Sequence, residues 1–284
     1  IKITKNLFDE FKIPNLVLSG GVALNCVANG KILKNTGFKN IWIQPASGDA
    51  GGSIGCALAV WYQEFKNERR ITYPDGMSGS YLGPSFSDEE IENKLISLNA
   101  VFDKYEYSNL LNITAKAIFD NKAVGWFQGR MEFGPRALGN RSILGNPISK
   151  ETQKNLNLKV KFRESFRPFA PSILKEDLNK WFNLDIESPY MLIVTDIKNE
   201  KKIEMTDDQK KLFGIEKLNI KRSDIPAVTH IDYTARIQTV SQKTNKLFYD
   251  LISKFKEKTG CPVIVNTSFN VRGEPIVNTP TDAF

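Results

Sequence analysis

Apolar and polar residues along the first 65 positions alternate in a repeating order of predicted helices and strands. Helical spacing of apolar residues recurs in three stretches, 3–11, 22–34 and 53–65. Two short apolar runs, 15–19 and 41–44, predict buried strands, and each ends in a turn of small residues. Strand, turn and helix, repeated twice, predict a parallel α/β layer. Because two strands are too few for an independent sheet, we expect further strands of this layer upstream.

Residues 66–85 differ in composition from both of their flanks. A charged run is followed, from Pro74 onward, by closely spaced prolines and glycines. This composition predicts a linker or domain boundary. We therefore divide the chain into a first unit, residues 1–75, and a second unit, residues 76–284.

The pattern of the second unit predicts a mixed α+β domain. Ser87 and Glu90 have the spacing of a capping box and predict a helix that starts there. Six strands are expected, at 123–128, 141–144, 168–174, 190–196, 231–240 and 262–266. Two more helices are expected, at 109–119 and 242–256. Residues 198–222 are rich in lysine and glutamate and predict a solvent-exposed insertion.

Composition narrows the class of protein. The chain has 284 residues, of which 41% are hydrophobic and 25% charged, as is typical of globular proteins. Its net charge of +7 is spread out, which disfavours nucleic acid as a partner. The apolar runs are far shorter than the ~20 residues of a membrane span, and no secretion signal is visible. Cys26, Cys56 and Cys261 form no CxxC pair and predict reduced thiols in a cytoplasmic protein.

Two turns that follow the predicted strands of the first unit are candidate ligand sites. Gly20 and Gly21 allow backbone N–H groups to approach an anion at a helix start, although packing alone explains a glycine turn equally well. Asp49 is more commonly an N-cap in such a position, and it is also a candidate oxygen ligand for a divalent metal. Two such turns at adjacent strand ends favour a ligand, because α/β sheets bind ligands there.

The second unit carries a denser set of candidate side chains. The stretch 129–142 places Arg136 and two other arginines among glycines, and Lys161, Arg163 and Arg167 follow. Arginine binds phosphate and carboxylate oxygens bidentately. A basic run is usually a solvated face, but four phenylalanines lie among these residues, Phe133, Phe162, Phe166 and Phe169. We therefore expect a partly buried anion pocket.

Three further polar residues are candidates near predicted strands. Ser268 and Asn270 follow the last core strand, and they either cap a turn or lie on one side as a hydrogen-bonding pair. His230 is the only histidine and lies close to Arg236 in the sequence. A lone histidine is more often structural than catalytic, and it cannot form a two-histidine metal site.

Taken together, the motifs resemble a known family, the O-carbamoyltransferases related to nodulation protein NodU and to the cephalosporin and tobramycin carbamoyltransferases. Six ordered motifs carry the resemblance: LSGGVALN, PASGDAGGSIG, GRMEFGPRALGNRSIL, KFRESFRPFAPSI, THIDYTARIQ and NTSFNVRGEPIV. The resemblance implies an α/β fold in which the C-terminal piece of a Kae-like, actin-type ATPase domain precedes a YrdC-like α/β domain. It also implies a chain that is truncated at both ends.

The resemblance implies a two-step reaction. The YrdC-like domain makes carbamoyl adenylate from carbamoyl phosphate and ATP, and the Kae-like domain transfers the carbamoyl group to a hydroxyl of a small-molecule acceptor at an iron site. By position, the implied catalytic residues of the adenylate site are Lys161, Arg136, Arg167 and Ser268. The implied cofactor-binding residues are Arg163, Arg236, Asn270, His230, Gly20, Gly21 and Asn25. Asp49 matches the aspartate ligand of the iron.

One departure from the family leads to a specific expectation. The family's other iron ligands come from a His-x-x-x-His motif that this sequence lacks, so we expect an incomplete transfer site and a missing N-terminal part of the Kae-like domain. The alternatives are a YrdC-like RNA-binding or tRNA-threonylcarbamoylation module and a non-catalytic binding remnant. The acceptor and the oligomeric state stay open, with a homodimer as one option.

Overall fold

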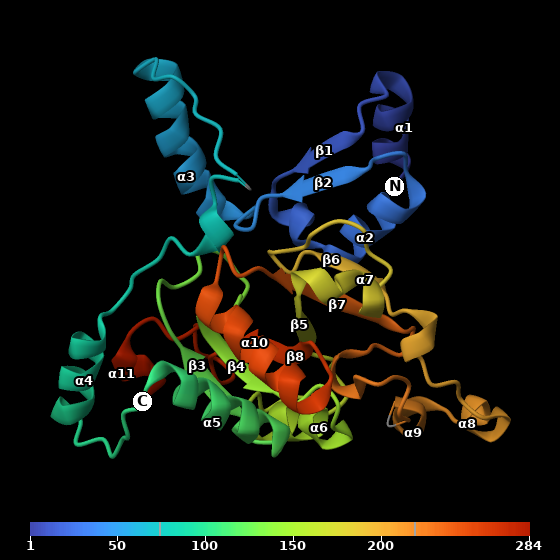
Figure 1. The fold of residues 1–284 in the computed structure, drawn as a ribbon. Helices are drawn as coiled ribbons and strands as arrows, with labels where there is room; N and C mark the ends of the chain where they lie inside the picture. Colours follow the sequence, from blue (N-terminus) through green and yellow to red (C-terminus); the bar gives the residue numbers. More distant parts are fainter. Residues whose placement is uncertain (74, 219) are drawn as a thin grey trace.

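The computed structural model describes residues 1–73, 75–218 and 220–284 and contains two β-sheets (Figure 1). Pro74, at the predicted boundary, lies outside the described residues. The first unit contains α1 (Lys2–Phe11), β1 (Asn15–Leu18), a 3₁₀ turn (Gly21–Leu24), α2 (Cys26–Asn35), β2 (Asn40–Ile43) and α3 (Asp49–Ala59). β1 and β2 pair in parallel, with Leu16 opposite Ile41. The predicted parallel layer is confirmed.

The predicted burial of the first strand is wrong. β1 alternates exposed and half-buried residues, and Val17 is 67% exposed. Within the described chain this sheet has two strands, so β1 has one neighbour and its other edge is unpaired. α3 stands away from this sheet in Figure 1 and buries none of its residues.

Two helices of the first unit begin at residues other than those predicted. α2 begins at Cys26, after the 3₁₀ turn, and Asn25 caps it: Oδ1 of Asn25 accepts a hydrogen bond from the N–H of Ala28 at 3.1 Å. α3 begins earlier than predicted, at Asp49. Asp49 therefore lies in the first turn of a helix, where the helix dipole favours a negative charge.

The second unit is built on a six-stranded sheet in the order β3-β4-β8-β5-β7-β6. Its strands are β3 (Val124–Phe127), β4 (Arg141–Gly145), β5 (Ala170–Leu174), β6 (Ile193–Asp196), β7 (Thr234–Val240) and β8 (Val263–Ser268). β5 and β7 are parallel, and the other neighbouring pairs are antiparallel. All six predicted strands are present, and the mixed α/β character is confirmed.

The helices of the second unit are α4 (Asp88–Ser97), α5 (Tyr107–Phe119), α6 (Lys150–Lys159), α7 (Leu178–Trp181), α8 (Asp207–Lys211), α9 (Gly214–Leu218), α10 (Lys246–Thr259) and α11 (Pro280–Ala283). α10 lies beside α5 and packs on β5 and β8 (Figure 1). It buries Phe248, Leu251, Ile252 and Phe255, whose spacing is that of one helical face. The predicted helices here, including the capping box of α4, are confirmed. No helix of the described residues is long and apolar enough to cross a membrane.

α6 is the long helix that the pattern did not predict. Most of its residues are polar, and it buries only Thr152, Leu156 and Asn157. Leu156 is the single buried apolar residue of α6 and makes no recognisable apolar stripe, so hydrophobic periodicity does not predict this helix. The predicted exposed insertion holds α8, which buries no residue.

Candidate anion-binding site

Lys161 is a buried cation of the second unit. The residue is 8% exposed, and its Nζ donates to Oδ1 of Asn270 at 2.8 Å and to Oγ of Ser268 at 3.2 Å. It also donates to the backbone carbonyls of both residues. Oγ of Ser268 donates to Oδ1 of Asn270 at 2.6 Å, so the two side chains form the hydrogen-bonding pair predicted from alternation.

Three arginines from different parts of the second unit form a series of neighbouring charges that begins at this lysine: Arg163 acts on Lys161, and Arg236 is acted on by Arg163 and Arg136. Arg163 is in the loop after α6, Arg136 in the loop before β4, and Arg236 in β7. Burial, and then the charges of Arg136 and Arg163, lower the pKa of Arg236 to about 10. Burial, and then the charge of Arg163, lower the pKa of Lys161 to about 8. We call Lys161, Arg136, Arg163 and Arg236 the basic cluster.

The basic cluster is electrostatically suited to an anion. Like charges brought together out of water disfavour one another's charged forms, as the depressed pKa values of Lys161 and Arg236 indicate. The partners of Lys161 are neutral oxygens of Ser268 and Asn270, which orient the ammonium without cancelling its charge. A bound phosphate would relieve the repulsion and accept hydrogen bonds from several cations at once.

Asn157, on α6, is a residue that sequence reasoning missed. It is fully buried, and its Oδ1 accepts a hydrogen bond from Nε of Arg163 at 2.6 Å. Its Nδ2 donates to the carbonyls of Ser165 and Arg167 at 3.0 and 2.8 Å. Asn157 therefore fixes the conformation of the loop after α6, which carries Lys161, through hydrogen bonds to Arg163, Ser165 and Arg167. No sequence signal marks it, because an asparagine in a polar helix predicts exposure.

Arg167 and two of the phenylalanines lie at the rim of the site. Nε of Arg167 pairs with Glu164 at 2.9 Å, and its side chain is 54% exposed. A cavity of about 630 Å³ opens here, bounded by both residues and by Lys161. Phe162 and Phe166 are 56% and 42% exposed. Phe162 nevertheless lines the cavity, and Phe169 is buried with the Arg163 guanidinium 5.0 Å from its ring centroid, so the four phenylalanines differ in their burial around the predicted anion pocket.

The arginine-rich stretch before β4 divides into one arginine at the site and two elsewhere. Arg141 is fully buried, stacks on Phe127 at 3.6 Å, and donates to the carbonyl of Gln128 at 2.7 Å. Arg130 donates to the carbonyl of Leu82 at 3.0 Å. Arg141 and Arg130 therefore donate hydrogen bonds to backbone carbonyl groups. Of the three arginines in this stretch, Arg136 alone belongs to the basic cluster.

His230 lies just before β7, beside the basic cluster. Its backbone N–H donates to the carbonyl of Thr234 at 2.8 Å and closes the turn that enters the strand. Burial is the main cause that lowers the pKa of its imidazole, and the charge of Arg236 adds to it. A neutral imidazole at this position is compatible with a structural role and with contact to a nucleotide.

The glycine turn of the first unit reaches the basic cluster of the second. Gly20 has φ of +92°, which glycine adopts without strain. Gly20, Gly21 and Asn25 are exposed. The carbonyl of Leu24 accepts a hydrogen bond from Nη2 of Arg136 at 3.5 Å. The structure thus places this predicted phosphate-side turn against an arginine of the other unit.

Asp49 does not form a metal centre with other described residues. It is exposed at the start of α3. Among residues 1–73, 75–218 and 220–284, no three His, Cys, Asp or Glu side chains are grouped so that they could hold a metal ion. The described residues therefore do not fit an iron site, and no chemical step is assigned to a metal in this chain.

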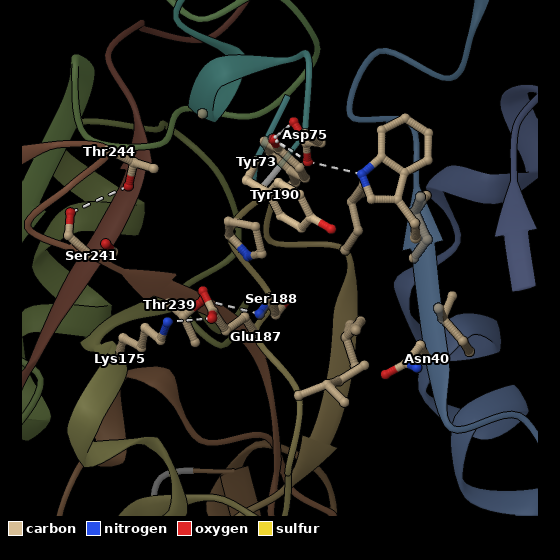
Figure 2. A pocket seen from close by; sticks show the side chains of 18 of the residues that line it. Asn40, Tyr73, Asp75, Lys175, Glu187, Ser188, Tyr190, Thr239, Ser241 and Thr244 are labelled. Atoms are coloured by element: carbon tan, nitrogen blue, oxygen red, sulfur yellow. Dashed lines mark hydrogen bonds and ion pairs between the residues drawn. The ribbon is translucent and has the colours of Figure 1, made fainter. Parts of the chain in front are cut away.

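A second cavity, of about 620 Å³, lies at the C-terminal ends of β5 and β7, where Lys175 and Ser241 line it (Figure 2). In its wall, the carboxylate of Asp75 accepts hydrogen bonds from Nε1 of Trp42 at 2.9 Å and from the hydroxyl of Tyr190 at 2.7 Å. Lys175 forms an ion pair with Glu187. Because these charged groups already have partners, we place the anion site at the basic cluster instead.

Comparison with known proteins identifies relatives along the whole chain. The most similar proteins include an uncharacterised protein of Synechocystis sp., 56% identical over 100% of this chain. Nodulation protein NolNO of Sinorhizobium fredii is 40% identical over 95% of it. The 3'-hydroxymethylcephem-O-carbamoyltransferase of Streptomyces clavuligerus is 31% identical over 99%. The chain spans 46%, 37% and 49% of the length of these three relatives.

Family models match both units. The carbamoyltransferase N-terminus model matches residues 1–58, within the first unit. The carbamoyltransferase C-terminus model matches residues 115–284, which include all four members of the basic cluster. The chain therefore belongs to the carbamoyltransferase family.

Proposed function

We propose that this chain binds ATP and carbamoyl phosphate at the basic cluster and forms carbamoyl adenylate there. The protein of which it is a part would then transfer the carbamoyl group to a hydroxyl of a small-molecule acceptor. The observation that carries the proposal is Lys161, held by Ser268 and Asn270 beside Arg163, with Arg236 and Arg136 continuing the same series of cations. We assign the first unit to the end of a Kae-like domain, the second to a YrdC-like domain, and the protein to the cytoplasm.

The proposed reaction requires stabilisation of negative charge. Water releases phosphate from carbamoyl phosphate and leaves carbamate, and a carbamate oxygen then attacks the α-phosphorus of ATP. The bond from the α-phosphorus to the bridging oxygen breaks, and pyrophosphate leaves. Charge on the transferring and leaving oxygens grows during this step, and prepositioned cations stabilise it without a general base.

The side chains of the site have distinct proposed roles. Lys161 and Arg136 hold phosphate oxygens, Arg163 and Arg236 add bidentate donors, and Arg167 at the rim meets the outer phosphates. Ser268 and Asn270 orient Lys161 and offer hydrogen bonds to the carbamoyl group. Gly20, Gly21 and Asn25 would lie on the phosphate side of the transfer domain, with His230 near the nucleotide.

The transfer step involves groups that this stretch of chain does not bring together. Iron remains part of the proposal for the longer protein, where Asp49 would be one ligand and would need partners from elsewhere. The residues of this chain carry the proposed chemistry only as far as the adenylate.

Pyrophosphate release tests the proposal. The chain is incubated with ATP and carbamoyl phosphate, and pyrophosphate and carbamoyl adenylate are quantified. Lys161→Met should reduce the rate at least ~100-fold, as expected for the loss of a cation in a charge-stabilising site. Lys159→Met removes a nearby exposed lysine on α6 and should match the wild type.

Two results would overturn the proposal. Absence of ATP binding by the folded chain would remove the adenylate site. A tRNA gel shift that persists at physiological salt, without pyrophosphate release, would favour the RNA-binding alternative, because weak phosphate contacts are lost as salt increases.

A further inference from the structure

Two loops line the cavity of about 630 Å³ beside the basic cluster: the loop that follows α6 and the segment that follows β8. Arg272, to which the sequence motifs assign no role, lies in the second of these. Its Nη1 donates to the carbonyl of Phe162 at 3.2 Å, and Nζ of Lys161 donates to Oδ1 of Asn270 at 2.8 Å. These two hydrogen bonds hold the segment of Arg272 against the loop that carries Lys161.

The hydrogen bond to Phe162 orients Arg272 and leaves it able to bind an anion. A carbonyl oxygen is a neutral acceptor, so it does not cancel the charge of the guanidinium group. The guanidinium has several further N–H groups, arranged as a planar fork that matches phosphate oxygens. Because Arg272 lines the cavity and is exposed, it is accessible to an anion that enters there.

Glu164 is the one acid among the described residues that line this cavity. Its Oε2 pairs with Nε of Arg167 at 2.9 Å, and both side chains are more than half exposed. A hydrogen bond with its own backbone N–H, and then the charges of Arg167 and Arg272, hold the pKa of Glu164 below its ordinary value. The carboxylate is therefore ionised at neutral pH and is attracted by both arginines.

We infer that Arg167 and Arg272 form an outer anion subsite, which the Glu164 carboxylate occupies until a ligand displaces it. The ligand is a diphosphate group, either the two outer phosphates of ATP or the pyrophosphate that leaves. This inference rests on the proposed function, because it takes the basic cluster as the site of the inner phosphate.

The weakness of the Glu164 ion pair is the physical reason for this assignment. An ion pair between exposed side chains is weak, because water screens it and two flexible side chains must be held in place. A diphosphate carries more charge than a carboxylate and can accept bidentate hydrogen bonds from two arginines at once. Pyrophosphate should therefore displace Glu164 from Arg167, and the return of the carboxylate should favour release of the product.

Titration of the chain with inorganic pyrophosphate tests the role of Arg272. Arg272→Gln should weaken pyrophosphate binding at least ~10-fold, the range of lost hydrogen bonds to a charged group. Arg272→Lys keeps the charge without the planar fork and should give an intermediate affinity. AMP lacks the outer phosphates, so its binding to both variants should match the wild type. Arg70→Gln, at an exposed arginine of the first unit, is the matched control.

A second pair of variants tests the competition by Glu164. Glu164→Gln removes the charge and keeps the shape, so it should tighten pyrophosphate binding about twofold to fivefold, the range of one exposed ion pair. In an Arg167→Gln background this gain should be lost, because the carboxylate no longer holds Arg167. A gain that persists in that background would show that Glu164 acts only as a nearby negative charge, and its competing role would be wrong. Glu204→Gln, at an exposed glutamate of the second unit, is the matched control.

The outcomes separate this inference from the proposed function. If the folded wild type binds no ATP but binds pyrophosphate through Arg272, the function fails and the anion subsite stands. If it binds ATP while Arg272→Gln and Glu164→Gln leave the affinity for pyrophosphate unchanged, only the subsite is wrong. An equal loss of pyrophosphate and AMP binding in Arg272→Gln would also overturn the subsite, because it would indicate a rearranged loop. Circular dichroism of each variant establishes that a loss of binding is not a loss of fold.

Discussion

At the scale of single residues, the protonation of Lys161 controls the charge of the site. Its ammonium is held by Ser268 and Asn270, yet burial and the charge of Arg163 lower its pKa to about 8. The lysine therefore titrates near physiological pH, far below an ordinary lysine. An anion bound beside it favours the protonated form and raises this pKa in the complex.

The affinity for ATP should accordingly depend on pH. Below the free-state pKa of about 8, Lys161 is charged and the affinity contributed by it is constant. Above that pKa, binding must recover a proton, so the dissociation constant should increase by up to about tenfold per pH unit. Titration calorimetry between pH 7 and 9.5 measures this effect.

Lys161→Met supplies the control for the pH dependence. In this variant the dissociation constant for ATP should no longer increase steeply above pH 8, and ATP binding should be weaker than in the wild type at every pH measured. A wild-type profile that is flat to pH 9.5 would contradict the assignment of Lys161 to the anion site.

At the scale of elements, α6 and the loop that follows it act as one unit. Asn157 joins them through hydrogen bonds to Arg163 and to the carbonyls of Ser165 and Arg167. Because the asparagine is fully buried, its partners have no access to water at that point. The loop that presents Lys161 is therefore ordered by a helix with little apolar character.

Replacing Asn157 by alanine should destabilise the fold and the site together. Unpaired buried donors and acceptors cost about 1–3 kcal/mol each, and relaxation recovers part of this, so we expect a loss of about 2–4 kcal/mol in the free energy of unfolding. ATP affinity should also fall, since Arg163 loses its orienting partner. Urea unfolding and ATP titration measure the two effects.

Asn155→Ala, on the same helix, is the comparison for this variant. Asn155 is only half-buried, and the change should stay within about 0.5 kcal/mol. Equal effects of the two substitutions would show that α6 matters only as a helix and that Asn157 has no special role.

At the scale of the whole molecule, several contacts join the two units. Asn29 and Gly30 connect α2 to β6 near the basic cluster. Asp75 connects Trp42 of β2 to Tyr190 beside the second cavity. Burial and the Asp75 carboxylate raise the pKa of Tyr190, so its hydroxyl stays a donor over the physiological range.

A double-mutant cycle should detect the coupling through Asp75. Tyr190→Phe and Trp42→Phe each remove a donor to the same carboxylate, and each should cost about 1–2 kcal/mol of unfolding free energy. Because both act through Asp75, the double variant should differ from the sum of the two by at least ~0.5 kcal/mol. Urea unfolding of the four proteins gives the coupling energy, and strict additivity would contradict a shared partner.

Local sequence patterns were sufficient to predict most helices and strands and part of the candidate anion-binding site. Strands, the capping box at Ser87 and the apolar face of α10 depend on interactions between neighbours in sequence, which periodicity and capping chemistry express directly. The Ser268 and Asn270 pair followed from alternation in the same way. α6 was not predicted, because it packs through the buried polar side chain of Asn157 and one buried apolar residue, Leu156. These residues make no apolar stripe that hydrophobic periodicity could detect.

The roles of chemically equal residues depend on contacts between distant parts of the chain. Arg136 and Arg141 are five positions apart in one motif, yet one meets the first unit and the other supports backbone carbonyls. The hydrogen bond from Asn29 to the carbonyl of Leu192 joins residues from two units and leaves no periodic trace in either segment. Residue type and spacing determine which side chains can bind an anion. Tertiary packing determines which of these side chains are removed from water and brought close to one another. A cation becomes part of a binding site because packing desolvates it.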